Sequence, residues 1–133
     1  MQIIEKPWGQ EEIIEINDRY MVKRLTMWKG HSCSLQYHNQ KKETIFVLSG
    51  RLRISLGPNR DELSSRVYTK GETITISPGE IHRMEGVEDS VYLEASTPEL
   101  DDVVRLADSS GRSAALIPSS SYPHLVVAPG SAN

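Results

Sequence analysis

Short stretches of alternating apolar and polar residues, rich in β-branched side chains, run from residue 11 to about residue 96. A period of two is typical of strands with one buried face, because successive side chains point to opposite sides. Turn-forming sequences such as KG, SG, GPNRDELS and SPGE separate the stretches. The pattern predicts strands at 11–16, 19–28, 32–38, 43–49, 51–56, 65–69, 72–76, 81–85 and 90–96.

These strands predict an all-β chain. A set of short strands without a convincing long helix must close or double over to bury its apolar face, which favours a sandwich or a jelly-roll β-barrel. After the last strand, TPELDDVVRLAD (97–108) is expected to form a short helix or an irregular turn. The Ser, Pro and Ala-rich residues 113–133 lack periodicity and predict a tail that is poorly ordered or packed on a partner chain.

Length and composition exclude several classes of protein. The 133 residues fit one domain, and a formal net charge of -3 gives no bulk positive charge for binding nucleic acid. No apolar run approaches the roughly 18 to 20 residues that span a bilayer, so no role in a membrane is expected. The only cysteine, Cys33, cannot form an internal disulfide, and MQIIEKPWGQ is unlike a signal peptide, which favours a reducing cytoplasm.

Metal-ligating residue types gather in SLQYHNQKKE and SPGEIH. Gln36 and His38 lie two apart in a predicted strand and share a face, while Glu43 opens the next strand after the NQKK turn. His82 follows a Pro-Gly turn. Together these residues offer nitrogen and oxygen donors for a divalent ion, with Zn the first choice and Mn, Fe or Ni the others. Taken singly, each histidine fits a surface or turn position, and their joint spacing favours the metal site.

The run from Gly30 through Gln36, His38 and Glu43 to Gly50 resembles the first motif of the cupins, with a glutamine in place of the motif's first histidine. The resemblance implies a single cupin jelly-roll barrel, or double-stranded β-helix, over residues 1–112. A short irregular or helical C-terminal extension and the tail at 113–133 would follow.

A second segment is similar to the second cupin motif. It runs from Gly71 through Gly79 to His82, with Ser77 where proline is usual and Pro78 one place later.

Within the cupins, the chain is most similar to the C-terminal domain of type II mannose-6-phosphate isomerases, including those fused to mannose-1-phosphate guanylyltransferase. KPWG, YMVKRLTMWKG, SLQYH, GETITISPGEIHRMEG, YLEAS and ELDDVVRLADSSGR carry the resemblance. It implies a metal-stabilised enediol mechanism on a sugar phosphate, a role in carbohydrate or polysaccharide metabolism, and a homodimer. Departures are HNQ at 38–40, where consecutive histidines are usual, and DSSGR in place of a DRYGR-like ending. We expect no guanylyl transfer, because the sequence has no nucleotidyltransferase phosphate loop.

An isomerase also needs an acid/base and cations for the phosphate. Glu94 shares a strand face with polar neighbours and is either a barrel-lining carboxylate or a solvated one. Lys41 and Lys42 in the turn between two ligands, and Arg83 beside His82, are the candidate cations, of which Lys42 and Arg83 join Glu94 as the predicted catalytic residues. For each lysine alone, a solvated hairpin tip is the simpler interpretation.

Other functions fit the same residues. An Fe(II) cupin dioxygenase would use a ligand-poor iron site with open positions for oxygen. A metal-stabilised barrel that binds a sugar-like ligand without turnover, or serves as an accessory subunit, is the non-enzymatic alternative.

Overall fold

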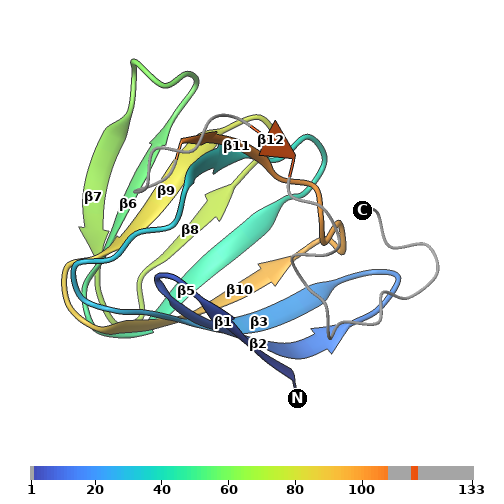
Figure 1. Cartoon of the computed structure of the whole chain (residues 1–133), viewed down its shortest axis with the longest axis horizontal. Helices are drawn as coiled ribbons and strands as arrows, with labels where there is room; N and C mark the ends of the chain where they lie inside the picture. Colours follow the sequence, from blue (N-terminus) through green and yellow to red (C-terminus); the bar gives the residue numbers. More distant parts are fainter. Residues whose placement is uncertain (1, 108–114, 117–133) are drawn as a thin grey trace.

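The chain folds into two antiparallel six-stranded sheets that face each other (Figure 1). This computed structural model describes residues 2–107 and 115–116. The first sheet has the order β1 (Gln2–Lys6), β2 (Gly9–Ile16), β3 (Met21–Met27), β10 (Ser90–Ser96), β5 (Glu43–Ser49), β8 (Thr73–Ile76). The second has the order β12 (Ala115–Leu116), β11 (Val104–Ala107), β4 (Leu35–Tyr37), β9 (Ile81–Gly86), β6 (Leu52–Gly57), β7 (Ser64–Tyr68).

The predicted all-β class is confirmed, and neighbours in each sheet that are distant in sequence give the crossovers of a jelly roll. β5 and β10 have their predicted bounds, and the other predicted strands are found within a few residues of theirs. Among the described residues there is no helix, and therefore none that could cross a membrane.

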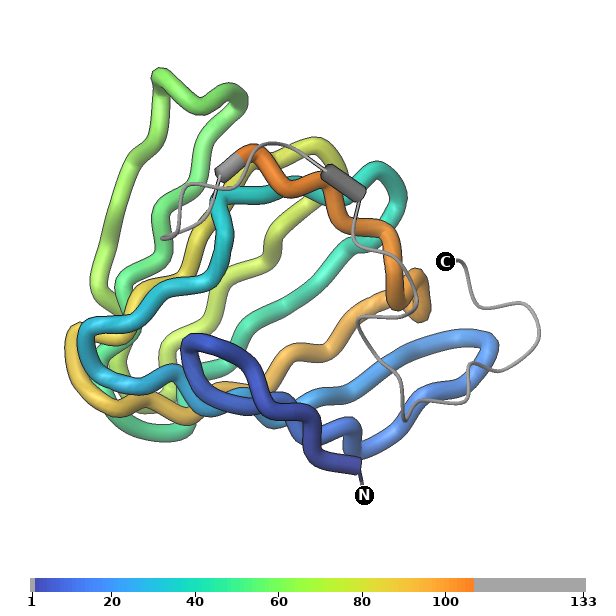
Figure 2. The backbone as a smooth tube through the Cα atoms, in the orientation of Figure 1, coloured from blue at the N-terminus to red at the C-terminus, as the bar shows by residue number. Residues whose placement is uncertain are grey.

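Two strands were not predicted within residues 2–107. β1 pairs antiparallel with β2, and β11 pairs with the edge of β4. Residues 97–103 form the expected turn, but Val104–Ala107 extends as a strand rather than a helix, because the free edge of β4 accepts its backbone hydrogen bonds. In Figure 2 this orange segment runs beside the blue-green trace of β4. Of the tail, only β12 is described, paired with β11.

The space between the sheets holds two apolar clusters. The larger includes Leu25, Ile45, Leu52, Met84 and Tyr92, all at most 4% exposed, from both sheets. Burying one such side chain contributes about 1.5 to 3 kcal/mol to folding. The smaller cluster consists of Ile4, Ile13, Met21 and Leu100.

Buried polar side chains occupy inward positions on the same strands as the apolar clusters. In β3, Lys23 lies between Met21 and Leu25 at inward positions, and in β10 Glu94 follows Tyr92. Strand pairing places Lys23 directly opposite Glu94. A layer of buried charge therefore lines the inside of the first sheet.

Candidate metal centre

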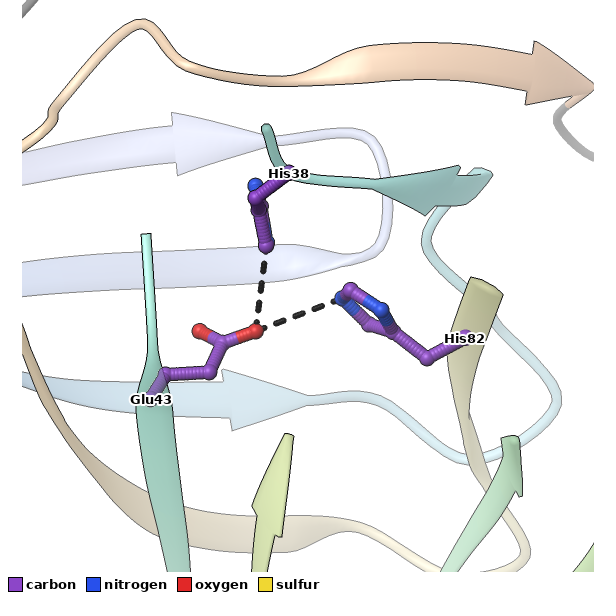
Figure 3. A group of neighbouring side chains, drawn as sticks. All are labelled: His38, Glu43 and His82. Atoms are coloured by element: carbon purple, nitrogen blue, oxygen red, sulfur yellow. Dashed lines mark hydrogen bonds and ion pairs between the residues drawn. The ribbon is translucent and has the colours of Figure 1, made fainter. Parts of the chain in front are cut away.

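Three of the four predicted metal ligands meet between the sheets (Figure 3). His38 directly follows β4, Glu43 is the first residue of β5, and His82 is the second residue of β9. The Glu43 Oε1 atom lies 3.2 Å from Nε2 of His38 and 3.3 Å from Nε2 of His82. One donor atom from each residue lies within 4.8 Å of the others. All three side chains are at most 2% exposed.

Backbone carbonyls fix the orientation of both imidazole rings. Nδ1 of His38 lies 2.6 Å from the carbonyl oxygen of Asp102, and Nδ1 of His82 lies 2.9 Å from that of Glu80. Since a carbonyl oxygen can only accept, each Nδ1 carries the proton and donates it. Each Nε2 is then the ring nitrogen that faces Glu43, with a lone pair in the neutral ring and as an N–H donor when the ring is protonated.

These donors suit a divalent cation. His82 Nε2 is buried and lacks a hydrogen bond of good geometry, although the Glu43 oxygen lies 3.3 Å away. Two imidazole lone pairs and one carboxylate, oriented from outside by hydrogen bonds, are the donors and supporting contacts of many protein metal sites. His38, Glu43 and His82 can therefore hold a metal ion.

Electrostatics keep the carboxylate charged. Burial alone would raise the pKa of Glu43, but Lys41, His38 and His82 hold it well below its usual value. Burial lowers the pKa of His38, whereas for His82 the contact with Glu43 outweighs burial and the pKa is raised. The ionised carboxylate is the form that binds a metal.

A second carboxyl group lies beside this cluster. Glu94 is 7% exposed, which answers the question that alternation left open, since its side chain lines the interior. Burial, and next the charge of Glu43, raise its pKa to about 7, against the opposing effect of Lys41 and Lys23. Lys41 Nζ lies 3.3 Å from Glu94 and 3.9 Å from Glu43, so this one ammonium group bridges both carboxylates.

Buried charges at Lys23, Glu11 and Lys41 are the part of the site that the sequence analysis missed or ranked too low. Lys23 is 2% exposed and its Nζ lies 3.6 Å from Glu11. Signals for two of them were present: Lys23 is in phase with the inward apolar residues of β3, and Lys41 is in phase with Glu43.

The remaining predicted residues are not among the three converging donors. Gln36 is directly opposite His82 on the neighbouring strand, but its Oε1 accepts a hydrogen bond from Ser34, 2.7 Å away. Lys42 is exposed. Arg83 alternates with His82, faces the other side of β9 and lies 3.5 Å from Glu85. Arg112, which the resemblance to the family offers as a weaker candidate cation, lies outside the described residues.

Comparison with known sequences identifies the family. Residues 1–108 match the family model described as mannose-6-phosphate isomerase, C-terminal. The chain is 31% identical over 119 residues to a mannose-1-phosphate guanylyltransferase of Escherichia coli K12, covering 82% of this chain and 23% of that protein. It is 30% identical, with the same coverage, to the xanthan biosynthesis protein XanB of Xanthomonas campestris. The chain thus spans about a quarter of the length of these relatives.

Solved structures support the fold. An RmlC-like cupin from Shewanella frigidimarina aligns with a TM-score of 0.66 at 16% identity, covering 76% of this chain and 86% of that one. An oxalate decarboxylase of Bacillus subtilis, whose structure was studied for its Mn(II) centres, aligns with a TM-score of 0.69 at 19% identity, covering 80% of this chain and 30% of that one. The chain has the cupin fold and belongs to the family of mannose-6-phosphate isomerase C-terminal domains.

Proposed function

We propose that the chain is a metal-dependent aldose–ketose isomerase acting on a sugar phosphate of the mannose 6-phosphate type. The observation that carries the proposal is the convergence of His38, Glu43 and His82 next to the buried Glu94, in a chain of this family. The proposal takes the substrate class from the family description. Guanylyl transfer, named for the long relatives, is not assigned to these residues.

His38, Glu43 and His82 would hold the metal ion, with Zn the first candidate and Mn, Fe or Ni the alternatives. A bound ion would supply Lewis acidity, which would make the proton on C2, next to the carbonyl carbon of the aldose, more acidic. Burial of all three side chains keeps their donor atoms from being hydrated individually.

Glu94 is the proposed proton carrier. Isomerisation moves one proton from C2 of the aldose to C1 of the ketose, and the hydroxyl proton on O2 is lost while O1 gains one, so the overall reaction releases no proton. A carboxyl group whose pKa lies near 7 can accept a proton and return it at neutral pH. Glu94 meets this requirement and lies in the same buried layer as the ligand Glu43.

Lys41 and Lys23 would keep Glu94 in place. Lys41 Nζ contacts its carboxylate at 3.3 Å, and Lys23 stands directly opposite on β3. Both ammonium groups favour the ionised carboxylate and therefore oppose the effect of burial on its pKa. We assign them positioning and charge balance rather than contact with the phosphate, because both lysines are buried.

A cavity of about 450 Å³, whose lining includes neither the three donor residues nor Glu94, is the proposed place for the phosphate end of the substrate. Its lining includes Leu56, which is directly opposite His82 on β6, and Glu80, whose carbonyl oxygen binds the His82 ring. Arg66, also in the lining, lies over the Tyr68 ring at 4.6 Å and is the cation that we propose for the phosphate. Arg66 takes the role that the sequence analysis gave to Lys42 and Arg83.

A barrel that binds a sugar-like ligand without turnover is the second candidate. The observation that favours it is the engagement of Glu94 by Lys41, which is also what a purely structural ion pair would show.

Isomerisation of mannose 6-phosphate to fructose 6-phosphate by protein loaded with each candidate metal tests the proposal. We expect turnover with at least one metal, and its loss both after chelation and in His38→Ala. Full activity in metal-free His38→Ala would overturn the mechanism. Bound metal without turnover of any sugar phosphate would favour the binding protein. Glu94→Gln, which should bind metal and fail to isomerise, separates proton transfer from metal binding.

A further inference from the structure

Asp102, in the turn between β10 and β11, makes an unusual set of contacts with the loop that follows His38. Its Oδ1 accepts the backbone N–H of Asn39 at 3.0 Å, and its Oδ2 accepts those of Gln40 at 2.6 Å and Lys41 at 2.9 Å. One carboxylate thus satisfies three successive backbone donors. These hydrogen bonds overcome partial burial and lower the pKa of Asp102, so the carboxylate is charged at neutral pH.

The backbone of the same residue holds the ring of His38. The Asp102 carbonyl oxygen lies 2.6 Å from Nδ1, which fixes a proton there and leaves Nε2 as the ring nitrogen that faces Glu43 at 3.2 Å. Asp102 therefore restrains both the loop backbone and the imidazole that the loop carries.

The loop held by Asp102 also ends at a functional group. It begins at His38, a proposed ligand, and reaches Lys41, whose ammonium group lies between Glu43 and Glu94. Its first residue is tied to the second ligand loop as well, because Gly79 donates its N–H to the carbonyl oxygen of His38 at 2.8 Å. A shift of this backbone would move a metal ligand and the bridging cation together.

From these contacts we propose that Asp102 is a positioning residue for the metal centre, which sets the ring orientation of His38 and the place of Lys41 before any metal binds. The inference rests on the proposed metal site. It assigns a task to a residue that touches neither metal nor substrate.

Asp102→Asn is the sharpest variant, because it keeps the size of the side chain and replaces one acceptor oxygen with an NH₂ group that faces backbone donors. We expect the affinity for Zn²⁺, measured by competition with a chromophoric chelator, to fall about 10- to 100-fold, the range seen when residues supporting a ligand are altered. Asp89→Asn is the matched control, since Asp89 also accepts a backbone N–H, that of Lys29 at 2.8 Å, and lies in the turn after β9, at the opposite end of that strand from His82. The control should bind Zn²⁺ like the wild type.

Imidazole ¹⁵N shifts of the metal-free protein give a readout that needs neither metal nor activity. The wild type should show His38 as a single tautomer protonated at Nδ1, and Asp102→Asn should show averaged shifts at His38 while those of His82 stay unchanged. If the wild-type ring is protonated at Nε2 or averaged, the inference is overturned, whether or not Asp102→Asn folds. It is also overturned if Asp102→Asn loses stability in urea while its Zn²⁺ affinity and His38 shifts match those of the wild type. If the wild type bound no metal, the proposed function would fail separately, and the tautomer would still decide on Asp102.

Discussion

Replacing Lys41 with methionine should destabilise the protein strongly, because it leaves two carboxylates buried without the cation between them. At 3.3 Å and 3.9 Å, and with an effective dielectric constant of about 20, the ammonium group attracts Glu94 and Glu43 by roughly 4 to 5 kcal/mol each. Much of this is offset because methionine avoids the desolvation of a buried ammonium. Breaking a buried pair by removing one partner costs about 3 to 5 kcal/mol, and we expect a loss in that range.

The assay is urea unfolding of the metal-free proteins at pH 8, followed by circular dichroism. At pH 6 the loss should be smaller, because Glu94, whose pKa is already raised to about 7, takes up a proton once Lys41 no longer opposes this. The double variant Lys41→Met, Glu94→Gln should recover part of the loss at pH 8. Lys42→Met, at the exposed neighbouring position, should change the free energy of unfolding by about 0.5 kcal/mol or less. Equal losses for Lys41→Met and Lys42→Met would refute the reasoning.

Three further predictions concern pH, backbone conformation and thiol chemistry. The folded wild type keeps a proton on Glu94 up to about pH 7, whereas the unfolded chain releases it near pH 4.5, so the free energy of unfolding falls as pH rises through this range. Glu94→Gln should lack this part of the fall. Identical pH profiles of urea unfolding for the two proteins would contradict the prediction. Gly50 has φ +86 and a Cβ there would lie 2.3 Å from the carbonyl oxygen of Asp89, whereas Gly30 has φ +80 and open space around the same position. In thermal unfolding, Gly50→Ala should lower the free energy of unfolding by more than about 2 kcal/mol and Gly30→Ala by about 1 kcal/mol. Equal losses would count against the described turn at Gly50. Burial raises the pKa of Cys33 to about 11, so a disulfide reagent at pH 8 should label the native protein far more slowly than the urea-unfolded chain, and equal rates would show that the thiol is accessible.

Strand alternation predicted most of the fold and three residues that converge between the sheets. β5 and β10 were placed at their bounds because each is a run of alternating residues bounded by turn sequences. His38, Glu43 and His82 could be found because each stands at the start or end of a strand beside a recognisable turn. Alternation alone could not predict which face of β10 is buried, and the buried face is the one that carries Glu94.

The other differences have physical causes. β11 forms on the edge of β4, a long-range pairing that local sequence does not reveal. Lys41 and Lys42 lie in the same turn, and Lys42 was the one predicted to be catalytic. Only Lys41 is in phase with Glu43. Arg83 was chosen for its proximity to His82, although neighbours in a strand point to opposite faces. The contacts of Asp102 join residues more than 60 positions apart, and no local pattern predicts them.

The metal content of reconstituted protein tests the central claim most directly. After loading with Zn²⁺ and removal of free ion, mass spectrometry of the metal should give one ion per chain in the wild type and in His31→Ala, a variant of an exposed histidine. His38→Ala, Glu43→Gln and His82→Ala should each retain far less, because each removes one of three converging donors. A wild type that retains no divalent ion of any of the candidate metals, or ligand variants that retain it as well as the wild type does, would contradict the account.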